Sequence, residues 1–197
     1  AGYKMLFRGM KIDCIYFHSH PYTSPEAQAK VEKLAGILAG YGLGGYLNII
    51  PFTKVQQQIR EKSPEAYLTL MMRICMMKIA NMTARGINSK CLITGESLAQ
   101  VASQTVENLT VTNSYAEFPV FRPLIGLDKE EITIEAKEIG TYETSILPYE
   151  DCCVMFSPKH PILHSNLKDA AEIFERMEID GLLEEAYAQR EVKKMSF

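Results

Sequence analysis

The sequence lacks three features that would assign it to common functional classes. No apolar stretch approaches the ~18 residues of a membrane-spanning helix. Residues 1–11 contain neither the apolar region nor the cleavage site of a signal peptide. With 21 lysines and arginines against 24 aspartates and glutamates, no global excess of positive charge predicts a nucleic-acid-binding surface. We therefore expect a cytoplasmic protein with no membrane partner, in which any contact with nucleic acid is local.

Cysteine is sparse and follows no framework pattern. The five cysteines are an odd number without regular spacing, which indicates reduced thiols rather than structural disulfides. No C-x-x-C motif is present. The strongest zinc candidate combines Cys152 and Cys153 with His160 and His164, but adjacent cysteines rarely both bind one tetrahedral ion. We predict no metal site.

The chain does contain a regular alternation of strand and helix patterns. Short apolar strands are predicted at 11–17, 46–52, 91–94 and 118–124. Helices are predicted at 24–42, 64–85, from the end of the third strand to about 108, and at 128–140. This order predicts an α/β fold with a parallel twisted sheet and helices on both faces. We expect one domain over 1–165 and a helical C-terminal extension over 166–197.

The segment "TGESLAQVASQT" (94–105) carries the most specific signal for ligand binding. Ligands bind beyond the carboxyl ends of the strands in such sheets, and Gly95 would let a ligand approach the backbone. Glu96 and Ser97 at a helix start would lie where free N–H groups favour an anion. An ordinary strand–turn–helix with a serine cap explains the same residues equally well. Arg73, inside an apolar helix pattern, and Arg122, at a strand end, are further candidates.

The loop "YEDCCVMFSPKHP" (149–161) leaves several interpretations open. Its adjacent cysteines could form a strained vicinal disulfide, or one could be a nucleophilic or sulfur-carrying thiolate. Asp151 would raise the pKa of a neighbouring thiol, whereas Lys159 and His160 could lower it. The remaining cysteines fall in predicted core segments and are expected to be inert: Cys14, Cys75 and Cys91.

Four segments together resemble the tRNA 4-thiouridine synthetases, sulfurtransferases that also serve thiamine thiazole synthesis. The segments are "FHSHPYTS", "TGESLAQVASQT", "FPVFRPLIGLDKEEI" and "IGTYETSILPYEDCCVMFSPKHP", in the order and spacing of that family. The resemblance extends from residue 1 to about 165. It implies an adenine nucleotide α-hydrolase-like fold of the PP-loop ATP pyrophosphatase type.

The resemblance also implies a nucleotide site. ATP, together with Mg²⁺, is the expected cofactor. At the matching positions Tyr16 and Phe17 would hold the adenine side, and the expected contacts to the rest of ATP are Arg73, Gly95 and Gln104.

The implied reaction is an ATP-dependent sulfur transfer to tRNA. A uridine carbonyl oxygen is adenylated, and persulfide sulfur delivered by a cysteine desulfurase then displaces AMP. The catalytic cysteine of the family matches Cys152, and Cys153 ranks second. A thiamine sulfur carrier protein is a further implied partner. The oligomeric state is left open, with a homodimer as one possibility.

The sequence departs from the family at its start. The family's phosphate-binding loop, S-G-G-x-D-S-P-V-A-G-Y, ends at residues 1–3, so the first strand and the loop are expected to be missing. A chain without that loop should be inactive alone. Two other hypotheses therefore stand beside that of a tRNA sulfurtransferase: a non-catalytic nucleotide-binding module, and another PP-loop ATPase. Residues 54–90, with seven lysines and arginines against two glutamates, could form a local tRNA-facing patch or an ordinary solvated helix face.

Overall fold

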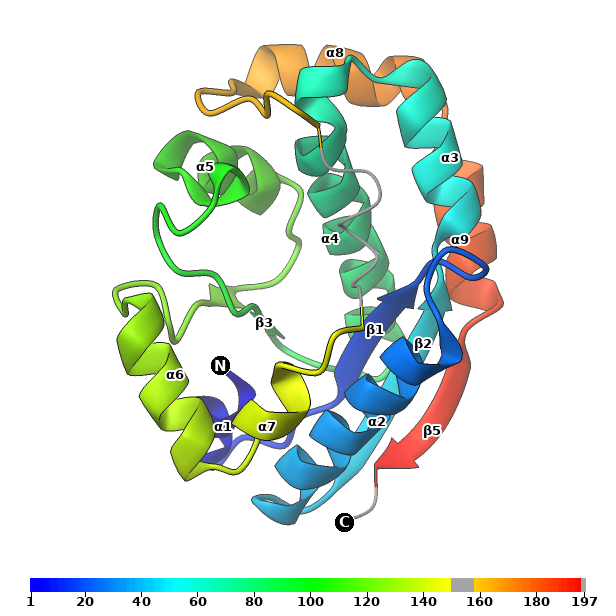
Figure 1. The fold of residues 1–197 in the computed structure, drawn as a ribbon. Coiled ribbons are helices and arrows are strands. Elements are labelled where there is room, and N and C mark those ends of the chain that lie inside the picture. Colours follow the sequence, from blue (N-terminus) through cyan, green and yellow to red (C-terminus); the bar gives the residue numbers. More distant parts are fainter. Residues whose placement is uncertain (150–157, 196–197) are drawn as a thin grey trace.

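The computed structural model describes residues 1–149 and 158–195. One sheet contains three strands in the order β1 (Cys14–His18), β2 (Gly45–Pro51) and β5 (Glu191–Met195). β1 and β2 are parallel, and β5 pairs antiparallel with β2. A second, parallel sheet contains β3 (Leu92–Ile93) and β4 (Val120–Phe121). The predicted α/β fold is confirmed (Figure 1).

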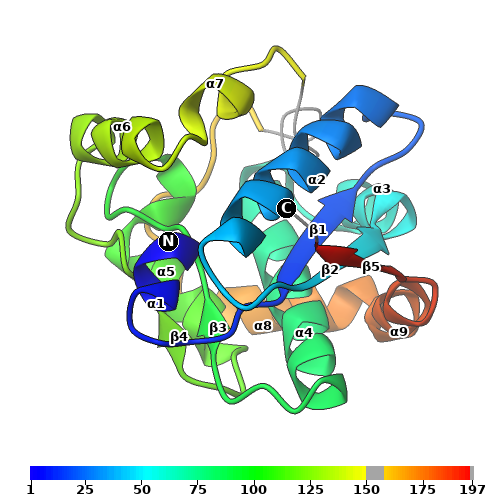
Figure 2. The same ribbon diagram turned by 90° about the horizontal axis from the view of Figure 1, so that it is seen from below.

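Nine α-helices are assigned within the described residues, and they surround the strands. They are α1 (Gly2–Leu6), α2 (Pro25–Gly40), α3 (Thr53–Lys62), α4 (Leu68–Gly86), α5 (Val106–Ser114), α6 (Lys129–Glu138), α7 (Tyr142–Ser145), α8 (Leu167–Met177) and α9 (Asp180–Ala188). Figure 2 shows α2 and α4 on opposite sides of the strands. Helices on both faces are what the apolar strands require, because each face must be covered.

Successive side chains of β1 and β2 point to opposite faces of the sheet and so enter two different apolar clusters. Leu47 and Ile49 pack with Ala35 and Ala39 of α2 on one face. Ile50 faces the other side, into the large cluster around α4. The period of two that defines a strand therefore sorts each apolar side chain to one of two cores.

Two helix starts follow from their capping residues as the sequence predicts. Ser24 accepts a hydrogen bond from the backbone N–H of Ala27, and Pro25 occupies the first helical position of α2. Asp128 and Glu131 form a reciprocal capping box at the start of α6. Capping of this kind satisfies N–H groups that no helical carbonyl can reach.

The C-terminal segment, residues 166–195 in the described part of the chain, packs into the large cluster around α4, which is the main core of the protein. Ile173, Phe174 and Met177 of α8 and Leu183 of α9 belong to the same buried cluster as α3 and α4. The segment also includes a strand, β5, that the sequence pattern did not predict. The division between 1–165 and 166–197 stays a prediction, although the shared cluster indicates that the two parts stabilise each other.

Candidate functional site

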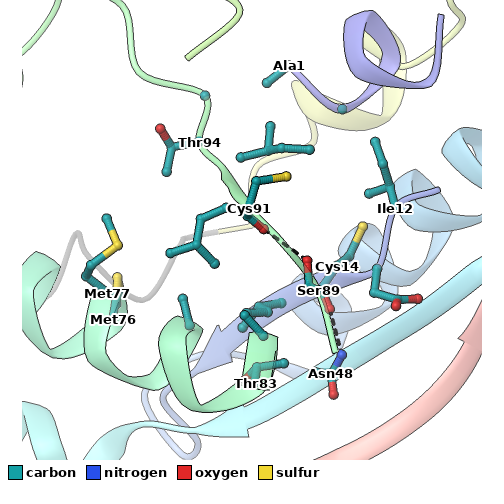
Figure 3. Close-up of a pocket in the computed structure, with 18 of the residues that line it drawn as sticks. Ala1, Ile12, Cys14, Asn48, Met76, Met77, Thr83, Ser89, Cys91 and Thr94 are labelled. Carbon is teal, nitrogen blue, oxygen red and sulfur yellow. Dashed lines mark hydrogen bonds between the residues drawn. The ribbon is translucent and has the colours of Figure 1, made fainter. Parts of the chain in front are cut away.

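A cavity of about 600 Å³ lies between the two sheets. Cys14, Ile15 and Phe17 of β1 line one side, and Leu92 and Ile93 of β3 line the other. Within 1–149 and 158–195, no strand pairs with the cavity-facing edge of β1 or of β3. The floor is formed by α4, and Figure 3 shows its methionine side chains beside the cavity. This volume falls in the range of small-molecule sites.

The cavity becomes polar beyond the carboxyl end of β3, where Glu96 is the central group. Its side chain is only 3% exposed and accepts hydrogen bonds from two arginines. Arg73 of α4 donates through Nη2, and Arg122, which follows β4, donates through Nε at 2.5 Å. Thr94 Oγ1 adds a third donor at 2.8 Å. Burial lowers the pKa of the Arg122 guanidinium.

The segment after β3 is a folded loop and not the helix that the sequence predicts. Ala99 has a left-handed backbone, φ 59°, which interrupts any helix. The loop is closed by Gln104, whose Oε1 accepts from Ser97 N at 3.1 Å and whose carbonyl accepts from Ala99 N at 2.9 Å. The helix, α5, begins only at Val106, capped by Thr105. The prediction that Glu96 and Ser97 start a helix is therefore wrong, and the chemistry at this loop comes from side chains.

Gly95 faces open space at this polar end of the cavity. A Cβ placed on Gly95 would have no atom within 4 Å, outside its chain neighbours. Internal packing therefore does not require glycine here. A ligand that approaches the backbone closely would require it, which favours a binding role.

The structure brings together most of the predicted nucleotide residues. Phe17, Arg73, Gly95 and Gln104 all line the cavity, although they come from β1, α4 and the loop after β3. Tyr16 points to the other face of β1 and packs beside the cluster under α2. Their contacts with a nucleotide stay predictions. The predicted catalytic residues, Cys152 and Cys153, lie outside the described residues.

Two features of the site were not predicted from the sequence. Arg73 and Arg122 were each candidates, but no pattern indicated that Glu96 joins them. Lys30 of α2, only 9% exposed, was not singled out at all. Its Nζ donates to the carbonyl of Tyr149 at 2.8 Å, which anchors the chain immediately before the cysteine-containing segment. Neither pairing leaves a local sequence signal, because the partners lie at least 23 residues apart.

The three cysteines that the structure describes are poor nucleophiles. Burial raises the pKa of the Cys14 thiol to about 11, and it raises the pKa values of Cys75 and Cys91 as well. At pH 8, a thiol with a pKa near 11 is about 0.1% thiolate, which suppresses its reactivity. This agrees with the predicted inert role of these residues.

We expect the native chain to leave Cys14, Cys75 and Cys91 largely unmodified when it is treated with iodoacetamide at pH 8. Peptide mass mapping would measure the modification of each residue. The same treatment in denaturant should alkylate all three, because unfolding removes the burial that raises their pKa values. Equal alkylation of Cys14 in both conditions would contradict the buried environment described here.

The basic segment 54–90 is largely neutralised by acidic partners. Lys54, Lys62 and Lys78 form ion pairs with Glu185, Glu178 and Asp180 near or within α9. Two further pairs occupy the arginines at 73 and 85. The structure therefore favours a paired helix surface over a concentrated tRNA-facing patch on this segment.

The described part of the chain contains neither a membrane-spanning helix nor a cluster of metal-binding side chains. No helix among residues 1–149 and 158–195 is long and apolar enough to cross a membrane. In the same ranges, no group of three or more His, Cys, Asp or Glu side chains could hold a metal ion.

Comparison with known proteins identifies the family. The family model described as "Thiamine biosynthesis protein (ThiI)" matches residues 1–179. A probable tRNA sulfurtransferase of Treponema pallidum (strain Nichols) is 55% identical over 190 residues, which cover 96% of this chain and 47% of that protein. One from Clostridium kluyveri (strain NBRC 12016) is 54% identical over 191 residues, covering 97% and 50%. The chain spans about half the length of the curated relatives it matches.

A solved structure shows the same fold. It is described as the crystal structure of a 4-thiouridine synthetase–RNA complex with bound ATP. It matches with a TM-score of 0.94 and 39% identity, over 99% of this chain and 51% of that one. The cavity, its flanking sheets and the surrounding helices thus form a PP-loop fold, and the chain belongs to the ThiI family of tRNA sulfurtransferases.

Proposed function

We propose that this chain is the ATP-binding and sulfur-transferring part of a tRNA uracil 4-sulfurtransferase. The observation that carries the proposal is the meeting of Phe17, Arg73, Gly95 and Gln104 at one cavity. These are four of the five residues that the sequence resemblance assigns to ATP. The structural relative with bound ATP and RNA supports ATP and tRNA as ligands of this chain.

The arrangement supports a specific placement of ATP. Phe17 lies on β1 and can contact the adenine, whereas Tyr16 could contribute only through its main chain, because its side chain packs under α2. Gly95 leaves room beside the backbone, and Arg73 supplies positive charge for the phosphates. Mg²⁺ would accompany the phosphates, as it commonly does when nucleotides bind. The family's S-G-G-x-D-S loop would complete the phosphate site, so we expect residues 1–197 alone to bind ATP weakly and not to turn over.

The chemistry proposed for the bound substrates has three steps. The uridine carbonyl oxygen attacks the α-phosphorus of ATP, and pyrophosphate leaves. A persulfide sulfur carried on Cys152, loaded by a cysteine desulfurase, then attacks the activated carbon and AMP leaves, so the base is joined to Cys152 through an S–S bond. A second thiol attacks the Cys152 sulfur, which releases 4-thiouridine and forms a disulfide with Cys152 that an external thiol reductant reduces. Cys153 is the alternative carrier. Donation of sulfur to thiamine thiazole synthesis, through a sulfur carrier protein, would use the same persulfide.

We expect replacement of Gly95 by valine to weaken ATP binding on the order of tenfold while leaving thermal stability nearly unchanged. The added side chain would enter the space that the nucleotide needs, and it meets no protein atom at its Cβ. Equilibrium dialysis against ATP and a thermal unfolding curve would measure both effects.

Gly126→Val is the matched control. Gly126 also has no atom within 4 Å of an added Cβ, and it does not line the cavity. Its replacement should leave ATP binding unchanged. Equal ATP affinity in Gly95→Val and the unaltered chain would contradict the proposed site and favour a module of another function.

A further inference from the structure

A single buried side chain joins two segments that are far apart in the sequence. Asn108, in the first turn of α5, is only 1% exposed. Its Nδ2 donates to the carbonyl of Ala102 at 2.7 Å and to the carbonyl of Ile162 at 2.8 Å. Because both acceptors are carbonyl oxygens, only the NH₂ group can face them, and the orientation of the amide is fixed.

The carbonyl of Ala102 belongs to the loop that lines the polar end of the cavity. Gly95 and Gln104 of this loop both line the cavity, and Gln104 closes the loop by accepting a hydrogen bond from Ser97 N at 3.1 Å. Ala102 lies two residues before Gln104. A ligand that moves or fixes this loop therefore acts on a carbonyl that Asn108 holds.

The carbonyl of Ile162 belongs to the chain that follows the adjacent cysteines. Ile162 comes directly after the loop 149–161, which carries Cys152 and Cys153. In the proposed reaction, sulfur on that loop must reach a carbon that the nucleotide has activated. A transfer of this kind is fast only when the reacting groups are held in a fixed relative position.

The start of α5 provides a fixed point between the two segments. Besides the bond from Asn108 to Ile162, Thr105 Oγ1 donates to the carbonyl of Leu163 at 2.7 Å. The N–H of Ile162 donates to the carbonyl of Ala66 at 2.9 Å, before α4 begins. The chain after the cysteines is thus held by α5 and by the residues before α4, and Asn108 is the side chain that also holds the cavity loop.

The role of Asn108 lies in the two bonds that it donates. Its Oδ1 is buried and has no hydrogen-bond partner within residues 1–149 and 158–195. An unpaired buried oxygen destabilises a fold, so the donated bonds account for what this amide contributes. Neither Asn108 nor Ile162 lines the cavity, so a bound ligand can affect Ile162 only through other residues.

We propose that Asn108 is a positioning residue for sulfur transfer: its amide holds the cavity loop and the chain after the cysteines in a fixed relative position. ATP binding at the cavity then alters the surroundings of Ile162 through Asn108. This inference rests on the proposed function, because it takes ATP as the ligand of the cavity and the cysteine-containing loop as the sulfur carrier. The coupling is reciprocal, so a ligand or partner that fixes Ile162 also changes the affinity for ATP.

The test is an ATP titration of the 197-residue chain, followed by NMR. The signals observed are the backbone amides of Gly95 and Ile162 and the side-chain NH₂ group of Asn108. The same titration is carried out on Asn108→Leu, because leucine is similar in size and cannot donate to either carbonyl. A merely structural role would shift the Ile162 signal equally with and without ATP.

Asn81→Leu is the matched control. Asn81 is 2% exposed, and its amide donates to the carbonyl of Tyr115 at 2.7 Å and accepts from the N–H of Glu117 at 3.1 Å. The replacement removes a buried bridging amide of the same kind, but one whose two partners lie outside both the cavity loop and residues 158–166.

We expect ATP to shift all three signals in the unaltered chain and in Asn81→Leu. In Asn108→Leu, ATP should still shift the Gly95 signal, but its effect on Ile162 should be lost. An ATP-dependent shift of Ile162 that persists in Asn108→Leu would overturn the positioning role. A side-chain signal of Asn108 that stays unchanged while Gly95 shifts in the unaltered chain would also overturn it, even if Asn108→Leu does not fold. A failure of ATP to shift the Gly95 signal would instead contradict the ATP site itself.

Discussion

Replacing Glu96 by glutamine is expected to lower the free energy of unfolding by about 3–5 kcal/mol, as is typical when one partner of a buried ion pair is removed. The substitution keeps the shape of the side chain but leaves the guanidinium groups of Arg73 and Arg122 without their shared carboxylate. Both would remain largely buried and positively charged. Urea denaturation followed by circular dichroism would measure the loss.

A surface pair provides the comparison. Glu117 and Arg85 form an ion pair in which both side chains are about half exposed, at 50% and 54%. Exposed pairs of this kind contribute at most about 1 kcal/mol, so Glu117→Gln should change stability only slightly. A Glu96→Gln variant as stable as Glu117→Gln would mean that Glu96 does not hold the two arginines in solution.

Ending the chain after Ser165 is expected to abolish cooperative folding. The deletion removes side chains at the centre of the main core, of which Met177, Ile179 and Leu183 are each no more than 1% exposed. Loss of one large buried side chain typically costs 2–5 kcal/mol, and whole domains are stable by only about 5–15 kcal/mol. The shortened chain should accumulate in the insoluble fraction, and any refolded material should show no cooperative unfolding transition.

A smaller deletion tests whether the effect comes from the core helices. Ending the chain after Gln189 removes β5 but keeps α8 and α9. This variant should still fold, with lower stability, because it loses the pairing of β5 with β2 and the contact between Lys193 and Glu32. Cooperative folding of the chain that ends at residue 165 would show instead that the C-terminal segment is a separate extension.

Much of this fold could be predicted because helix starts and strands are determined largely by residues that are neighbours in the sequence. The capping residues Ser24 and Asp128 start α2 and α6 where the sequence indicates. Both bounds of β2 and the end of β1 lie within one residue of the prediction. Only the start of β1, at Cys14, comes later than predicted. Such elements depend on a few adjacent side chains and are little altered by distant contacts.

Elements that depend on distant partners were missed. β5 has the sequence of a charged surface segment, EVKKM, and becomes a strand only because the edge of β2 is available. α3 is mostly polar and buries Val55, Gln56 and Ile59 against the core. The loop after β3 resembles a helix in sequence, yet Gln104 folds it back on itself.

In the candidate site, too, residue identities could be predicted from the sequence, whereas contacts between distant residues could not. The resemblance supplied the residue identities, and four of the five residues predicted to bind the nucleotide meet at the cavity. The connection through Glu96 could not be predicted, since its partners lie 23 and 26 residues away on other elements. A buried ion pair becomes recognisable only when the fold brings its members together.

We propose that this chain carries sulfur on Cys152 for transfer to a nucleotide-activated tRNA. The most direct test is the intact mass of the chain before and after incubation with a cysteine desulfurase and cysteine, followed by peptide mapping. We expect a mass increase of one sulfur atom, which reductant removes and which maps to Cys152. The increase should disappear in Cys152→Ser but persist in Cys153→Ser. An adduct that persists in Cys152→Ser, or no adduct on the unaltered chain, would contradict it.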